Sequence, residues 1–478
     1  MPAYLKIMGA EFFGLIGIFI ALQAFIQTSD LGLSSAIMRE ASRLIAGKTN
    51  KTHFNNHLRA VEWVISIIAL SAILITIALS GYIEEIFQKH AETTTNIKLI
   101  IILMMLASLP KLGSGVYKNA LIGFEKQQKS NIISVIFATF RYAGVIPLIS
   151  LLPSKGVAFF SFQAAVSFAE LCTFAWVAYA SISTTRNISK PNFGYLKDLW
   201  PVAAPMAFLS MAWVILTNFD RIILAKILEP TEYGYFSLAA IGAAGILTFI
   251  TPLSQILLPR MTILSEHNKT IELIDLFRVS TQIITAFFLS LGGTLFTFSA
   301  YAIYAWTGSL EVTNNSALIF GWYSLANAIA GILYLPFVLQ FSHGSLHLHF
   351  WGNILSIGIQ IPAILWAASY FGAYGVVLTI LTVRIIFLFY WTPLIFNRIT
   401  PQITYSWLLK DVLPSGVLAL LFLYIIHSSL PQPENRVEAA LIIITGFMTT
   451  FFATILTLNN PRKILIRSAA SMLHKKTS

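Results

Sequence analysis

Charged residues are scarce in this sequence. Asp, Glu, Lys and Arg together make up 11% of the 478 residues, whereas an average soluble domain contains about 25%. So few charged side chains cannot cover the surface of a globular protein with polar groups. The composition therefore excludes an ordinary soluble enzyme or binding module.

Cysteine and aspartate are rarer still. Cys172 is the only cysteine, so the chain cannot form an intrachain disulfide, and it lies in an apolar stretch that is typical of a small buried residue. Asp occurs at five positions and never in an Asp-x-Asp motif. Gly47-Lys48-Thr49 is not a P-loop, because Ser42 stands where the motif needs its first Gly. We therefore expect no catalytic residues and no cofactor.

A metal site is not expected either. His343, His347 and His349 lie close together in the sequence, and the first two have the i,i+4 spacing that can bind a metal ion. They fall in a short turn without a nearby carboxylate or cysteine, which favours an ordinary interfacial turn.

Long apolar runs take the place of the missing charge. Mean hydropathy is +0.75, and stretches of about 20 apolar residues, enough to cross a bilayer, recur along the chain. Because lipid offers backbone groups no water partner, each run should be helical. The sequence predicts an all-α, polytopic membrane bundle with thirteen spans near residues 12–28, 58–83, 97–121, 130–152, 157–181, 198–226, 234–258, 277–305, 317–341, 348–370, 373–396, 407–430 and 437–458.

Lys and Arg are divided unequally between alternate loops. One set of loops contains most of them, whereas the opposite set contains only Lys6, Lys89, Lys98, Lys155, Lys226 and Arg436. The positive-inside rule places the basic set and the C-terminal tail in the cytoplasm. This asymmetry explains much of the net charge of +11, so we do not expect a nucleic-acid partner.

An internal repeat divides the chain. Lys6-Ile7-Met8 resembles Lys226-Ile227-Leu228, and later matches keep an offset of about 220 residues. In the second copy a helix over 198–226 precedes the motif, so we expect that the first copy has lost its first helix, through a late start codon or a truncation. The predicted parts are an N-terminal lobe over 1–190, a C-terminal lobe over 191–400, and two extra spans with a basic tail over 401–478.

Several charged residues fall inside predicted spans. A charge at the bilayer centre costs at least about 2.5–3.5 kcal/mol, so it usually faces a partner or a wet cavity. Structural ion pairs account for some of these residues, but cations outnumber anions, which favours an anionic visitor such as a diphosphate. The cations are Lys111, Lys118, Arg141, Arg221 and Arg384, and the anions are Glu170 and Asp220.

Short motifs resemble a known family. The segments Gly9–Leu15, Asp30–Leu33 with Arg39-Glu40, Tyr117-Lys118 with Leu121–Phe124 and Asn131, Asp220–Leu224, Tyr233–Phe236 and Leu258–Arg260 are similar to bacterial polysaccharide and O-antigen flippases. These flippases belong to the multidrug/oligosaccharidyl-lipid/polysaccharide exporter superfamily. The likeness is strongest over residues 5–280, and only hydropathy continues it after about residue 300.

The resemblance implies two helical lobes around a cation-lined central cavity in the bacterial inner membrane. It also implies alternating-access transport of an undecaprenyl-diphosphate-linked oligosaccharide, with membrane lipids, a polysaccharide polymerase and other assembly proteins as partners. Together with the charge pattern, it predicts that Lys111, Lys118, Arg141, Arg221 and Arg384 bind the substrate. Arg39 and Arg260 would attract it at the cytoplasmic mouth, and Glu170 and Asp220 would couple an ion or form structural pairs.

Two alternatives remain open at this point. A multidrug cation exporter of the same superfamily would need net acidic residues at mid-membrane, which are missing here. A saccharide polymerase or O-acyltransferase would need a large outer loop or an intramembrane His paired with Asp or Asn, and the one obvious intramembrane His is His427, near a span end.

Overall fold

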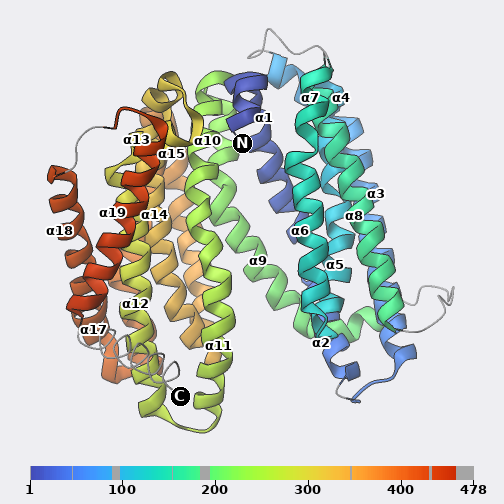
Figure 1. Ribbon diagram of the computed structural model, residues 1–478. Helices are drawn as coiled ribbons and strands as arrows, with labels where there is room; N and C mark the ends of the chain where they lie inside the picture. The colour runs from blue at the N-terminus through green and yellow to red at the C-terminus, as the bar shows by residue number, and fades with distance from the viewer. Residues whose placement is uncertain are drawn as a thin grey trace, which may run out of the picture. The chain divides into compact units, whose positions relative to one another are not determined.

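The computed structural model describes residues 2–45, 47–88, 97–152, 154–182, 194–344, 347–429 and 433–458. All regular structure in these residues is helical, and they contain no strand (Figure 1). The prediction of an all-α fold is confirmed. Arg186, Lys190 and the predicted basic tail beyond residue 458 lie outside the described residues.

The chain forms two compact units. Unit 1 consists mainly of Ala3–Ala225, and unit 2 mainly of the residues from Tyr235 onward. The helix over Gly194–Ile227 therefore belongs almost entirely to unit 1, although the repeat places it in the second lobe. The lobe boundaries at residues 190 and 400 describe the sequence repeat and stay predictions. The boundary between the two compact units lies between residues 225 and 235.

Unit 1 is a bundle of long helices with short connections. Its helices are α1 (Pro2–Thr28), α2 (Leu33–Ile45), α3 (Lys51–Gln88), α4 (Ile97–Ser108), α5 (Pro110–Gly123), α6 (Gln127–Ala143), α7 (Val145–Leu151), α8 (Lys155–Ile182) and α9 (Gly194–Ile227). Its core contains fully buried side chains from α2, α3 and α5, among them Ile37, Phe54 and Ala120. Helices α1 and α2 form a pair bent by 49°.

Asp30 explains the bend between α1 and α2. Its carboxylate accepts hydrogen bonds from the backbone N–H of Gly32 at 3.0 Å and of Ser34 at 3.1 Å. These bonds satisfy donors at the start of α2 that have no helical partner. The Asp30–Leu33 motif is thus a cap that ends one helix and begins the next.

Unit 2 contains only helices and the short turns between them in its described residues. Its helices are α10 (Pro230–Ala244), α11 (Ile250–Glu266), α12 (Thr270–Thr297), α13 (Ser299–Thr307), α14 (Leu310–Ser342), α15 (His347–Ile386), α16 (Thr392–Ile399), α17 (Thr404–Trp407), α18 (Leu413–Ser429) and α19 (Arg436–Thr457). Short 3-10 turns at Gly245–Phe249 and Pro401–Ile403 and π-helical turns at Phe387–Trp391 and Leu408–Val412 connect some of them. Helix α14 packs against α12 and α15 and lies in the core of the unit.

The described residues contain eleven helices that are long and apolar enough to cross a membrane, or twelve if the bent pair counts as one span. The sequence predicts thirteen because it divides the 53-residue segment His347–Ile399 into two spans. A straight helix of that length would measure about 80 Å, far more than a hydrocarbon core of about 30 Å. The backbone breaks inside the segment at Gly372, whose φ of 58° is left-handed, at the position of the predicted division.

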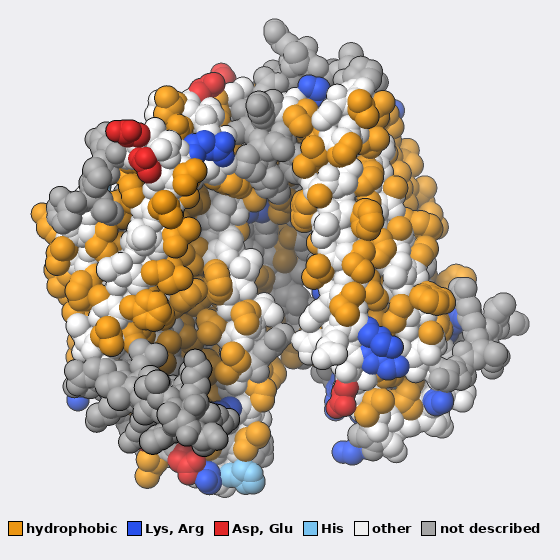
Figure 2. Space-filling view, viewed as in Figure 1, with side chains coloured by type: hydrophobic (Ala, Val, Ile, Leu, Met, Phe, Trp, Pro, Cys, Tyr) orange, Lys and Arg blue, Asp and Glu red, His pale blue; other side chains and the backbone are white. Residues whose placement is uncertain are grey.

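The outward faces of these helices are apolar. On α3, Ile67, Leu70 and Leu74 have exposed fractions of 49%, 60% and 59%. Figure 2 shows hydrophobic side chains over the length of the helices in both units, with most of the visible charged side chains toward the helix ends. Such a surface suits lipid rather than water.

Candidate functional site

The candidate site lies in unit 1, where α5, α6 and α8 meet. Pro110 has no backbone N–H, and it starts α5 directly after α4 ends at Ser108. Lys111 therefore stands in the first turn of α5. A Cβ on Gly113 would come within 2.7 Å of the Leu171 side chain of α8. The missing side chain lets α5 approach α8 closely, which brings Lys111 to Glu170.

Glu170 binds two cations at once. Its Oε2 accepts hydrogen bonds from Lys111 Nζ and from Arg141 Nη2, each at 2.6 Å. Arg141 Nη2 also donates to Ser167 Oγ at 3.2 Å, and Gln163 Nε2 donates to the backbone carbonyl of Arg141 at 3.3 Å. Three helices thus contribute to one polar cluster, which we call the Glu170 cluster: Lys111, Arg141 and Glu170.

Basic side chains outnumber acidic ones in the Glu170 cluster. Two cations share one carboxylate, and their side chains are only 15% and 10% exposed, against 9% for Glu170. The buried Nε of Arg141 has no hydrogen-bond partner among the described residues. A buried donor without an acceptor is costly, so the hydrogen bonding of the cluster is incomplete among the described residues.

Lys118 lies two helical turns after Lys111 on α5, near the same face of the helix. Lys118 is partly buried and forms no ion pair with a described residue. It extends the positive region of the Glu170 cluster along α5.

The remaining predicted site residues are not part of this cluster. Arg221 and Asp220 are buried on α9, and Arg221 Nη1 donates to Asn218 Oδ1 at 3.0 Å. In unit 2, Arg384 of α15 donates to Asn327 Oδ1 of α14 at 2.8 Å, and Asn327 in turn donates to the carbonyl of Ala243 at 3.0 Å. The structure therefore gives each of these arginines a polar neighbour on the inside of its own unit.

Arg39 on α2 and Arg260 on α11 are both exposed, and neither forms an ion pair within the described part of the chain. Exposure suits the predicted role of attracting an anion from solvent. That role and the substrate-binding roles of the other residues stay predictions.

A second polar network in unit 1 surrounds Glu62, which sequence reasoning missed. Glu62 Oε1 accepts hydrogen bonds from the Tyr117 hydroxyl at 2.7 Å and from the Tyr179 hydroxyl, and Oε2 accepts one from Arg59 Nη1 at 2.9 Å. The Arg59 guanidinium lies 5.3 Å from the centre of the Tyr179 ring. Glu62 stands three residues after Arg59 on α3. This i,i+3 spacing of opposite charges on a helix is enough to predict the Arg59–Glu62 ion pair from the sequence.

Unit 2 contains a balanced pair that sequence reasoning also missed. Asp411 is fully buried and accepts hydrogen bonds from Arg278 Nε at 2.9 Å, Arg278 Nη2 at 3.3 Å and Gln282 Nε2 at 2.7 Å. Both charged residues lie near predicted span ends, where the sequence alone suggests solvated loops. Residues 133 positions apart gave no sequence signal for their contact.

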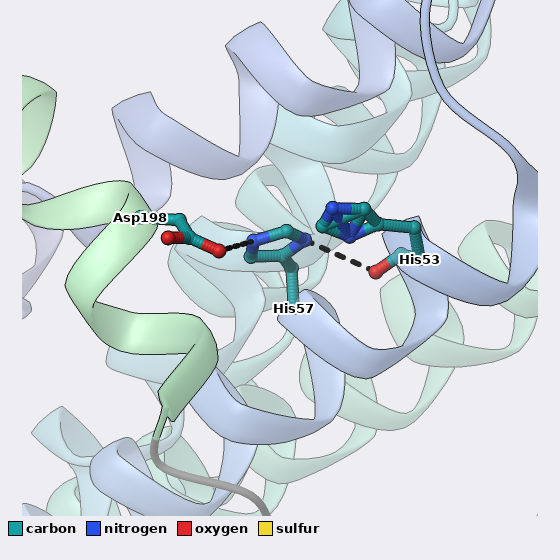
Figure 3. A group of neighbouring side chains, drawn as sticks. All are labelled: His53, His57 and Asp198. Atoms are coloured by element: carbon teal, nitrogen blue, oxygen red, sulfur yellow. Dashed lines mark hydrogen bonds and ion pairs between the residues drawn. The ribbon is translucent and has the colours of Figure 1, made fainter.

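The three histidines near the turn after α14 each have another contact in the described residues. His343 Nδ1 lies 3.0 Å from the carbonyl of Leu339, His347 Nε2 accepts from Trp351 Nε1, and the His349 ring packs on Phe337. The described residues instead bring together His53 and His57 of α3 with Asp198 of α9, whose ligand atoms all lie within 4.8 Å of one another (Figure 3).

Comparisons with known proteins agree with this architecture. A family model described as polysaccharide biosynthesis protein matches residues 1–265. No curated protein matches the chain. The matched residues include all the segments that resemble the flippases.

Solved transporters share the fold. A structure of the lipid II flippase MurJ in an inward closed conformation has a TM-score of 0.66 and 15% identity, and the match covers 94% of each chain. An inward-facing multidrug resistance MATE family transporter of the MOP superfamily has a TM-score of 0.70 and 14% identity, with 83% of this chain and 93% of that one covered. A MOP superfamily transporter from Pyrococcus furiosus has a TM-score of 0.54 and 14% identity, with 83% and 88% covered. The chain is thus a multi-pass membrane protein with a transporter fold.

Proposed function

This chain belongs to the polysaccharide biosynthesis protein family, and we propose that it is a flippase for a lipid-linked oligosaccharide diphosphate. The substrate would be an undecaprenyl-diphosphate-linked repeat unit of O-antigen, capsule or exopolysaccharide. It would move from the cytoplasmic to the periplasmic leaflet of the bacterial inner membrane by alternating access. The fold shared with a lipid II flippase and with MATE transporters supports a transporter of this type.

The observation that carries the proposal is the excess of cations in the Glu170 cluster. Lys111 and Arg141 share a single carboxylate oxygen. Removing a charge from water is costly, so an uncompensated cation inside a membrane protein usually serves a ligand. A diphosphate offers several charged oxygens, and it matches the donors of Arg and the point charge of Lys.

The cluster can exchange partners without leaving a cation bare. A phosphate oxygen would replace Glu170 Oε2 as the partner of Lys111, and Glu170 would then pair with Arg141 alone. The phosphate would also offer Arg141 Nε the hydrogen-bond acceptor that it lacks. Lys118, further along α5, would hold a second phosphate oxygen. The prenyl tail would stay in lipid while the saccharide crosses a wet path.

The membrane potential favours this direction of transport. With the cell interior negative, outward movement of an anion gains about 2.3 kcal/mol per charge for each 100 mV. The exposed Arg39 and Arg260 would raise the concentration of the anion at the cytoplasmic side. Arg221 and Arg384 would bind the substrate at later points of the path.

Export of cationic drugs is the second candidate, because a multidrug MATE transporter has a similar fold. A cation exporter requires acidic groups in excess where its substrate binds. The Glu170 cluster has the opposite balance, with two basic side chains to one acidic side chain. The charge balance therefore favours an anionic substrate.

The test is a deletion of the gene in its native host, complemented with the wild-type gene and with Arg141→Ala, Arg384→Ala and Lys129→Ala variants. Lys129 is a matched control, because it is a basic residue of α6 that is exposed and outside the Glu170 cluster. Surface polysaccharide and the leaflet position of lipid-linked repeat units in inverted vesicles are measured.

We expect the deletion to remove surface polymer and to trap repeat units on the cytoplasmic leaflet. Wild type and Lys129→Ala should restore export, whereas stably expressed Arg141→Ala and Arg384→Ala should not. Normal surface polysaccharide in the deletion strain, with no redundant transporter, would exclude the saccharide substrate and turn attention to drug efflux.

A further inference from the structure

A group of potential metal ligands lies at the beginning of α3 and α9, apart from the Glu170 cluster. His53 and His57 are one helical turn apart on α3, and Asp198 extends toward them from the second turn of α9 (Figure 3). All three residues belong to unit 1. The sequence predicts no metal site, although His53 and His57 have the i,i+4 spacing that places two imidazoles on one helix face.

His57 is oriented as a metal ligand would be. Its Nδ1 lies 3.0 Å from the backbone carbonyl of His53, so a proton on Nδ1 leaves the lone pair of Nε2 free. A hydrogen bond from the second ring nitrogen to a carbonyl is the usual support for a metal-binding histidine. The residue is 1% exposed, and Nε2 has no hydrogen-bond partner among the described residues.

The nearest carboxylate oxygen stands at a separation that suits two ligands of one ion. Asp198 Oδ2 is 3.9 Å from His57 Nε2, which is too long for a hydrogen bond. Two ligands about 2.0–2.1 Å from a tetrahedral Zn²⁺ ion lie roughly 3.3 Å apart. A shift of a few tenths of an ångström in the exposed Asp198 side chain closes the difference.

His53 completes the group. Its ring is stacked on that of His57, with 4.4 Å between centroids, and its Nδ1 has no hydrogen-bond partner among the described residues. One of its ring nitrogens lies within 4.8 Å of the other two ligand atoms, and a rotation of this partly exposed side chain would direct its lone pair toward a shared ion. The Tyr195 ring packs against both imidazoles, and its hydroxyl accepts a hydrogen bond from Asn56 at 3.1 Å. These contacts hold the start of α9, and with it Asp198, beside α3.

We propose that His53, His57 and Asp198 bind a divalent transition-metal ion, with Zn²⁺ as the best match. Two imidazoles and one carboxylate suit Zn²⁺ and related ions, whereas Mg²⁺ and Ca²⁺ prefer oxygen ligands throughout. The side chain of Asp198 is 65% exposed, so water reaches the fourth position from solvent. The bound ion links the first turns of α3 to those of α9, and the site is independent of the transported substrate.

The experiment uses the full chain in detergent, free of any polyhistidine tag and stripped of metal with a chelator. Zn²⁺ binding is measured by competition with a chromophoric chelator, and Co²⁺ is added separately to record its visible absorption. We expect one tight Zn²⁺ per chain and a Co²⁺ spectrum of tetrahedral intensity. Asp198→Asn should weaken Zn²⁺ binding by at least about tenfold, and the double variant His53→Ala/His57→Ala should abolish it.

The matched control is His343→Ala/His347→Ala, which removes a histidine pair of the same spacing from positions where the two rings have other partners. It should bind Zn²⁺ like wild type. If the double variant of the buried His57 does not fold, Asp198→Asn and His53→Gln decide the question, because these side chains are partly or largely exposed. Absence of a tight Zn²⁺ site in wild type, or equal affinity in wild type and Asp198→Asn, would overturn the proposal.

Discussion

The buried ion pairs of the two units differ in their balance. In unit 2, Arg278 and Asp411 form a one-to-one pair with two hydrogen bonds between them, and Gln282 supplies a third bond to the carboxylate. In unit 1, Lys111 and Arg141 both bind the same oxygen of Glu170. The first arrangement matches one basic side chain with one acidic side chain, whereas the second has two basic side chains to one acidic side chain.

The difference separates two roles for buried charge. A neutral pair with every oxygen bonded can hold helices together without any other molecule. A cluster with an extra cation is poorly suited to that purpose, because the extra charge adds repulsion and desolvation. Unit 1 also contains a balanced pair, Arg59 with Glu62, so the imbalance is a property of the Glu170 cluster and not of the whole unit.

The largest effect on stability is expected in unit 2. Arg278→Met leaves the carboxylate of Asp411, which is fully buried, without its cation. Breaking a buried pair in this way costs about 3–5 kcal/mol. The free energy of unfolding in mixed detergent–SDS micelles measures the loss.

Lys269→Met is the control for that variant, because Lys269 forms an exposed pair with Glu272 that should contribute less than about 1 kcal/mol. Equal stability losses in the two variants would mean that the Arg278–Asp411 pair is not the structural element that its burial suggests. The Arg278–Asp411 pair could then no longer serve as the example of a structural ion pair with which the Glu170 cluster is compared.

A smaller effect is expected at the balanced pair of unit 1. Tyr179→Phe removes one hydroxyl donor from Glu62 but keeps the ring beneath Arg59. A hydrogen bond to a charged group contributes about 1.5–3 kcal/mol, so the free energy of unfolding should fall by about that amount. Transport should be retained. Tyr424→Phe, at a side chain that is 73% exposed, is the control and should be neutral. If Tyr179→Phe lost transport but kept its stability, the Glu62 network rather than the Glu170 cluster would be the site that serves transport.

Much of the fold could be predicted from the sequence. Apolar length and the need to satisfy backbone groups in lipid define each span, and even the division near Gly372 followed from hydropathy. The sequence shows the Asp30–Leu33 motif but does not predict the bend there. Hydropathy carries no information on the capping hydrogen bonds of the Asp30 carboxylate. The limits of the compact units depend on the side to which α9 packs, which no local pattern specifies.

The site could be predicted only as separate positions. Each mid-span charge was identifiable, since charge in an apolar run is conspicuous, but the meeting of Lys111, Arg141 and Glu170 depends on the register of three helices. Glu62 and Asp411 were missed because hydropathy near a span end does not separate a buried carboxylate from a solvated one. His53, His57 and Asp198 were missed for the same reason, as 141 positions of sequence separate the aspartate from its nearer histidine in the chain.

The smallest effect on stability, and the sharpest test of the comparison, is expected for Lys111→Met. This change leaves Arg141 and Glu170 as a neutral pair like that of unit 2. The lost hydrogen bond to Glu170 should be offset by the relief of repulsion and desolvation, so the free energy of unfolding should change by less than about 1 kcal/mol. Flipping of lipid-linked repeat units in inverted vesicles should nevertheless fall about tenfold or more, because a charge-assisted hydrogen bond to phosphate is worth about 1.5–3 kcal/mol.

Lys129→Met, at the exposed lysine of α6, should change neither quantity. A large loss of stability in Lys111→Met with an unchanged flipping rate would show that the second cation serves the fold. The two units would then use buried charge in the same way, and the case for an anionic substrate would have to rest on Lys118, Arg221 and Arg384. Unchanged stability with lost transport would instead assign the extra positive charge of the Glu170 cluster to the substrate.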